Sequence, residues 1–121
     1  MRSTILAAFS ALTFLAAAML GAVPSTAHHG WSSYQTEAVK ISAPIKAVRY
    51  QNPHGEIEVE HDGATWVVVL APVSRMQARG LPAEALTEGK TVEVEAYPIK
   101  SGEKEMRAER ITVDGKTVEL R

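Results

Sequence analysis

Two adjacent histidines, His28 and His29, are the residues of this chain best suited to holding a metal ion. They follow a segment typical of a secretory signal, with a basic residue near the start, an apolar run over residues 5–20, and small side chains at Ser25 and Ala27. Small residues at positions −3 and −1 predict cleavage after Ala27. The processed chain would then begin with a free α-amine and two imidazoles, and imidazole suits copper, zinc and nickel.

Copper is the ion that this start favours most. The α-amine has a pKa of about 8, so a metal can displace its proton at neutral pH. The amine can close a chelate ring with the His28 imidazole, or it can chelate together with the backbone nitrogen and the ring of His29. Cu(II) prefers such tetragonal nitrogen sets and tops the divalent affinity order. We therefore predict a copper site at His28 and His29. The alternative is that both histidines are solvated polar residues.

A third candidate ligand, His54, lies in the segment Asn52-Pro53-His54-Gly55. Asparagine, proline and glycine are common turn residues, so a turn explains every residue of the segment except the histidine. Loops on a rigid scaffold often carry function, which makes His54 a further candidate ligand. The alternative is a turn or packing histidine. His61 is a weaker candidate, because a strand with a rise of about 3.3 Å per residue would hold it roughly 23 Å away from His54.

The composition argues against several other chemistries. The chain has no cysteine, which excludes thiolate catalysis, thiol redox chemistry and cysteine zinc sites. No convincing Ser/His/Asp set or phosphate-binding glycine loop is present. A formal net charge of −1 gives no electrostatic footprint for nucleic acid or an anionic membrane. We therefore predict a protein that is not an enzyme; a small copper oxidoreductase built on the two N-terminal histidines is the remaining catalytic alternative.

The chain after residue 38 has the pattern of short β-strands. Apolar and polar residues alternate, or form a continuous apolar run, over residues 39–45, 57–59, 65–70, 92–96 and 106–113, and residues 117–120 suit a short closing strand. The alternation slips by one residue near 46–47 and again between 108 and 111, which predicts two β-bulges. The Asp-Gly pairs at 62–63 and 114–115 suit tight hairpins.

One interval between turns is long enough for a helix. It starts with Pro72, which is acceptable at the first helical position, and ends at Gly80, which is typical of the residue after a helix. Val73 and Met76 lie one turn apart on the same face, and Leu81 could make the apolar contact that accompanies such an end. The two methionines of the mature region, Met76 and Met106, fit core positions better than a metal site.

Strands and helix together predict an all-β fold. Three strands, a short helix between strands 3 and 4, and two or three further strands match a small OB-like Greek-key barrel of five to six strands. The alternative is a generic β-sandwich or open barrel. We predict three segments: a signal peptide over 1–27, a lead-in over 28–38 that Trp31 and Tyr34 fold back onto the barrel, and the barrel over 39–121.

Three stretches of the sequence resemble a family of short exported bacterial proteins of unknown function. They are His28-His29-Gly30-Trp31-Ser32-Ser33-Tyr34, Asn52-Pro53-His54-Gly55 and Arg79-Gly80-Leu81. The C-terminal Asp114-Gly115-Lys116, followed by Leu120-Arg121, is also similar to the pattern of this family. The resemblance covers essentially the whole mature chain and implies a periplasmic location, but it implies little about activity. A looser likeness, at the level of the fold, is to periplasmic copper-efflux chaperones, which use a histidine, two methionines and a tryptophan. No methionine pair flanks the strand that carries Trp66, so their site does not carry over.

These observations predict an exported, periplasmic protein that binds a transition metal, copper above all, through His28, His29 and His54. Its role would be binding or delivery, with the metal ion and another periplasmic protein as partners, and without nucleic acid or, after signal cleavage, a membrane. The alternative is an exported OB-fold module that binds a protein, peptide or small ligand on its barrel face without a metal.

Overall fold

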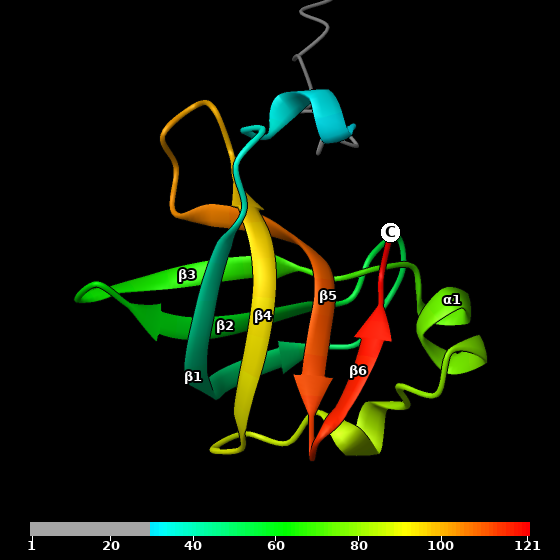
Figure 1. Ribbon diagram of the computed structural model, residues 1–121. Helices are drawn as coiled ribbons and strands as arrows, with labels where there is room; N and C mark the ends of the chain where they lie inside the picture. Colours follow the sequence, from blue (N-terminus) through cyan, green and yellow to red (C-terminus); the bar gives the residue numbers. More distant parts are fainter. Residues whose placement is uncertain (1–29) are drawn as a thin grey trace, which may run out of the picture.

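The computed structural model describes residues 30–121, which form a β-barrel with one short α-helix (Figure 1). The strands in chain order are β1 (Val39–Arg49), β2 (Glu56–His61), β3 (Ala64–Val69), β4 (Thr91–Pro98), β5 (Glu105–Val113) and β6 (Lys116–Glu119). The helix α1 (Val73–Ala78) and a 3-10 turn, η2 (Ala83–Ala85), lie between β3 and β4, and a second 3-10 turn, η1 (Trp31–Ser33), precedes β1. None of the helices in this part of the chain has the length and apolar character needed to cross a membrane.

Five of the strands close into a barrel. The strand order is β3-β2-β1-β4-β5-β6, and an additional pairing of β3 with β5 closes the ring. That closing pair is parallel, whereas the other neighbours are antiparallel. The long β1 pairs with β4 through its first half and with β2 through its second half. The predicted OB-like barrel with a short helix between the third and fourth strands is confirmed.

Both predicted bulges occur where the strands bend. In β1 the register against β2 shifts between Ile45 and Ala47. In β5, Ala108 and Arg110 lie opposite consecutive residues of β4, so Glu109 is the extra residue. Each bulge returns the apolar side chains to the barrel interior after the alternation slips.

The inward-facing side chains form one hydrophobic core, to which every strand and α1 contribute. Met76 and Met106 are fully buried within it, as their predicted packing role requires. The first half of β3 is more exposed than its apolar sequence predicts. Of the residues in this strand, only Val68 and Val69 are buried. Trp66 is therefore a partly buried residue that packs against the core at its margin.

The helix end and the hairpins follow local turn chemistry. Gly80 has φ of +84°, and the N–H groups of Gly80 and Leu81 donate to the carbonyls of Gln77 and Met76 at 3.2 and 2.8 Å. This is the Schellman arrangement, with Leu81 buried beside the helix. Pro72 lies one position earlier than predicted, at the N-cap. In each Asp-Gly hairpin both residues have positive φ, as two-residue type I′ turns require.

Candidate functional site

Two of the three predicted metal ligands, His28 and His29, lie outside the described residues, which begin at Gly30. Over residues 30–121, no group of three or more His, Cys, Asp or Glu side chains is arranged to hold a metal ion. The structure does describe the segment that follows the two histidines and the surface against which that segment packs.

The lead-in folds back onto the end of the barrel at which β4 ends. The N–H of Gln35 donates to the carbonyl of Pro98 at 2.8 Å, and the N–H of Lys100 donates to the carbonyl of Ser33 at 2.9 Å. These bonds fasten the lead-in to the segment that follows β4, above the barrel in Figure 1. The predicted return of the lead-in to the barrel is confirmed.

Tyr34 is the deepest anchor of the lead-in. It is 3% exposed, its backbone forms a bridge with Ile99, and its hydroxyl donates to the Glu105 carboxylate at 2.8 Å. Burial, followed by the hydrogen bond to Glu105, raises the pKa of Tyr34 well above its ordinary value. The phenol therefore remains a neutral donor at physiological pH.

Trp31 lies among aromatic and cationic side chains. The Tyr97 ring meets it nearly edge-on, with the ring centroids 5.8 Å apart. The guanidinium carbons of Arg107 and Arg121 lie 4.4 and 4.5 Å from the centre of the Trp31 ring. Each such cation–π contact stabilises by about 0.5–1 kcal/mol at an exposed site. We call Trp31, Tyr97, Arg107 and Arg121 the aromatic–arginine cluster.

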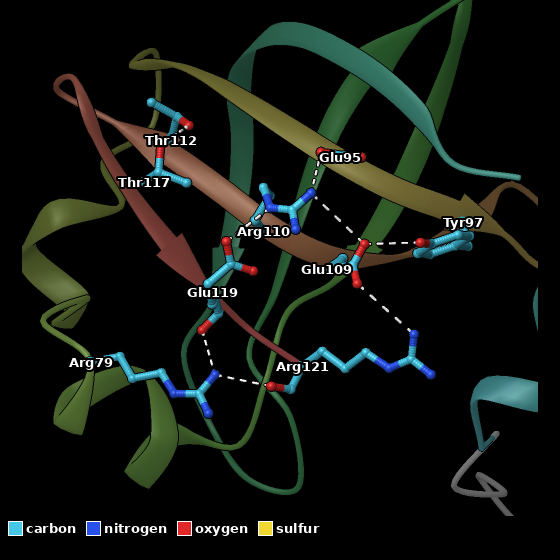
Figure 2. A network of polar contacts seen from close by, with 9 residues as sticks. All are labelled: Arg79, Glu95, Tyr97, Glu109, Arg110, Thr112, Thr117, Glu119 and Arg121. Carbon is cyan, nitrogen blue, oxygen red and sulfur yellow. Dashed lines mark hydrogen bonds and ion pairs between the residues drawn. The ribbon is translucent and has the colours of Figure 1, made fainter.

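Further arginines surround this cluster. Burial lowers the pKa of Arg107, and the charges of Arg75 and Arg121 lower it further. The guanidinium of Arg75 donates to the Leu120 carbonyl, and that of Arg79 donates to the main-chain oxygens of Glu119 and Arg121. Figure 2 shows the Arg121 side chain extending away from Arg79, on the side where η1 lies. The lead-in therefore meets the barrel beside several arginines, with the carboxylates of Glu105 and Glu109 bonded to the hydroxyls of Tyr34 and Tyr97.

A shallow cleft of about 250 Å³ opens beside the cluster. Its walls come from Trp31, Tyr34 and Tyr97, from the polar side chains of the lead-in, and from Lys100 and Arg121. Among the described side chains that line it, two are cationic and none is a carboxylate. The cleft is therefore chemically suited to an anion with an apolar part.

His54, the third predicted ligand, lies at the same end of the barrel as the cluster. It is half-buried and lies two residues before Glu56, the first residue of β2. Glu56 pairs with Val69 of β3, and Val69 pairs with Arg107 of β5. Adjacent strands are about 4.8 Å apart, so the backbones of Glu56 and Arg107 lie about 10 Å apart. The guanidinium of Arg107 contacts Trp31, so the loop that carries His54 lies near the lead-in.

His61 lies at the other end of β2, as predicted. Its ring packs nearly edge-on against Trp66, with the ring centroids 5.9 Å apart, and its Nε2 lies 3.2 Å from the Asp62 carboxylate. These contacts belong to the β2–β3 hairpin. The structure therefore places His54 and His61 at opposite ends of β2.

A network of charged side chains covers the outer face of β4, β5 and β6 (Figure 2). Arg110 lies between the carboxylates of Glu95 and Glu119, and the Tyr97 hydroxyl donates to Glu109 at 2.9 Å. A second cleft of about 310 Å³ lies over this face. Arg110, the arginine of this cleft, is already paired with carboxylates, which indicates a structural role. The neighbouring Glu109 holds the hydroxyl of Tyr97 in place for the aromatic–arginine cluster.

Sequence reasoning did not identify Tyr97, Arg107 or Arg121. All three occupy polar positions on or just after strands, and such positions look the same as ordinary solvent-facing residues in an alternating pattern. Only the pair Trp31 and Tyr34 indicated that the lead-in would pack on the barrel.

The chain matches the model of a protein family described as a family of unknown function, DUF6152, over residues 16–108. No curated protein matches the chain.

Proposed function

The chain belongs to this family of unknown function, and we propose that it is an exported metal-binding protein that takes copper and acts in binding or delivery. The proposed ligands are the α-amine freed by cleavage after Ala27 and the imidazoles of His28 and His29, with His54 as a further ligand. The observation that carries the proposal is the anchoring of the lead-in, because Trp31 and Tyr34 tie the residues directly after His29 to the barrel.

Anchoring confines the proposed ligands to a small volume. A chain extends by at most about 3.6 Å per residue, so the α-amine of His28 would lie within about 11 Å of Trp31. Ligands confined in this way lose less conformational freedom on binding a metal than ligands on a free tail do. The whole protein would therefore bind the metal ion more tightly than a short peptide with the same N-terminal sequence does.

The arginines of the cluster oppose a bound cation only weakly. At about 10 Å in water, a divalent ion and one guanidinium repel each other by about 0.8 kcal/mol, and physiological salt reduces this about threefold. Loss of a single ligand that weakens binding tenfold corresponds to about 1.4 kcal/mol. The arginine charges would thus adjust the affinity of the site without abolishing it.

Two measurements test this proposal directly. Intact-mass analysis of the exported protein should give a chain that begins at His28; another start would remove the chelating amine and contradict the proposal. Calorimetric titration of the processed protein with Cu(II) should give an affinity above that of a His-His-Gly peptide. An affinity no higher than the peptide's would contradict the proposal and favour the metal-free ligand-binding alternative.

A matched pair of variants tests whether His54 takes part. His54→Ala should weaken Cu(II) binding by more than tenfold, or about 1.4 kcal/mol, because the loop that carries His54 lies at the end of the barrel where the lead-in packs. His61→Ala should leave the affinity unchanged, because that histidine belongs to the opposite hairpin. Equal, negligible effects of the two variants would confine the site to the N-terminus.

A further inference from the structure

We propose that the cleft beside Trp31 binds a small aromatic carboxylate. This site differs from the proposed copper site in its residues and in its ligand chemistry, and it requires no metal. It is formed by Tyr97 and Arg121 of the aromatic–arginine cluster together with Lys100 and lead-in residues from Trp31 to Thr36.

Arg121 provides the main recognition group. Its side chain is 56% exposed, and the nearest carboxylate that it contacts, Glu109, is 3.9 Å away, which is too far for a tight pair. The cation–π contact with Trp31 holds the guanidinium at this edge of the cleft, with its central carbon 4.5 Å from the centre of the ring. A guanidinium stacked on a ring keeps N–H donors at its edge, and these suit the two oxygens of a carboxylate.

The other walls of the cleft match the apolar part of such a ligand. Trp31, Tyr34 and Tyr97 supply aromatic surface, and the ammonium of Lys100 adds a second positive charge. Ligand pockets for drug-sized molecules usually measure about 300–1,000 Å³. At about 250 Å³ this open cleft fits a smaller molecule, such as one ring with one carboxylate.

The second cleft, over β4 and β5, has cationic and anionic side chains in equal number and serves as an internal comparison. Its lining includes Glu93 and Glu95, and Arg110, its arginine, is paired with carboxylates. An added carboxylate would have to compete there with Glu95 and Glu119 for the guanidinium of Arg110. The charges of the two clefts therefore direct an anion to the one beside Trp31.

Benzoate is a suitable probe, with benzamide as its uncharged counterpart of the same shape. In heteronuclear NMR titrations of the purified protein in EDTA, benzoate should shift the indole N–H signal of Trp31 and leave that of Trp66 in place. Benzoate should also bind at least tenfold more tightly than benzamide. Equal binding of the two probes, or benzoate shifts centred on Trp66, would overturn the proposal.

Two charge-removing variants complete the test. Arg121→Gln should weaken benzoate binding at least fivefold, whereas Lys40→Gln, an exposed lysine in the second cleft, should leave it unchanged. Unchanged binding by Arg121→Gln would overturn the proposal. Because EDTA excludes copper, a failure here leaves the metal proposal standing, and a failure of copper binding leaves this site standing.

Discussion

Replacement of Gly55 by alanine should destabilise the barrel through a single contact. A Cβ at this position would lie 2.4 Å from Cε and 3.3 Å from Sδ of Met76. Carbon atoms in contact are normally about 3.5–4.0 Å apart, so the methyl group must move by more than about 1 Å. Met76 is fully buried in a closely packed core, where such overpacking costs about 1–3 kcal/mol.

The backbone at Gly55 partly offsets this cost. Gly55 is not among the residues with positive φ, so alanine adds no strain there, and it reduces the freedom of the unfolded chain by about 0.4–1 kcal/mol. The expected net loss is therefore about 0.5–2 kcal/mol. Gly30→Ala is the matched control, because φ is −59° there and the nearest atom to the new Cβ, Ser32 Oγ, is 3.9 Å away. We expect that variant to be neutral or slightly stabilised.

Urea unfolding measures both variants, and a double-mutant cycle isolates the contact. With a slope of about 1–3 kcal/mol per M, a loss of about 1 kcal/mol lowers the midpoint by roughly 0.3–1 M. In a Met76→Leu background, where the side chain lacks the reaching methyl group, Gly55→Ala should cost at least about 1 kcal/mol less. An equal cost in both backgrounds, or a midpoint for Gly55→Ala equal to that of Gly30→Ala, would refute this reasoning.

Three further substitutions test the lead-in and the helix end. Tyr34→Phe removes a part-buried hydrogen bond to the Glu105 carboxylate and should cost about 1.5–3 kcal/mol in urea unfolding at pH 7. Because the pKa of Tyr34 is raised in the folded state, its phenol loses the proton at lower pH in the unfolded chain than in the folded one. The stability of the wild type should therefore fall above about pH 10 more steeply than that of Tyr34→Phe. Equal slopes of stability against pH for the two proteins, in thermal melts from about pH 8 to pH 11, would contradict this assignment. Trp31→Ala should loosen the lead-in and accelerate hydrogen exchange at the Lys100 N–H, which donates to the lead-in, while an unchanged rate would show that Trp31 is no anchor. Gly80→Ala places a side chain at φ of +84° and should cost about 1–2 kcal/mol in the same unfolding assay, and a neutral result would count against the helix-end geometry.

The parts of the fold that depend on local chemistry could be predicted from the sequence. The Asp-Gly hairpins, the two bulges and the helix end at Gly80 all formed where the pattern indicated, because each depends on residues a few positions apart. The OB-like barrel was predicted from the succession of elements along the chain, with one short helix between the third and fourth strands. The conclusion that Trp31 and Tyr34 would bind the lead-in to the barrel also came from the sequence, although their partners did not.

Those partners were decided by the tertiary structure alone. The aromatic–arginine cluster forms because the antiparallel pairing of β4 with β5 places Arg107 opposite Tyr97, next to the segment to which the lead-in is bonded, while the end of the chain brings Arg121 there as well. Gly55 likewise meets Met76 only in the folded barrel. Such contacts join residues far apart in the chain, and a polar residue on the outer face of a strand has the same sequence pattern whether it faces water or a tryptophan. The sequence alone therefore determined the barrel and its turns, whereas the cleft and its charges depend on how the lead-in and the end of the chain pack against the end of β4.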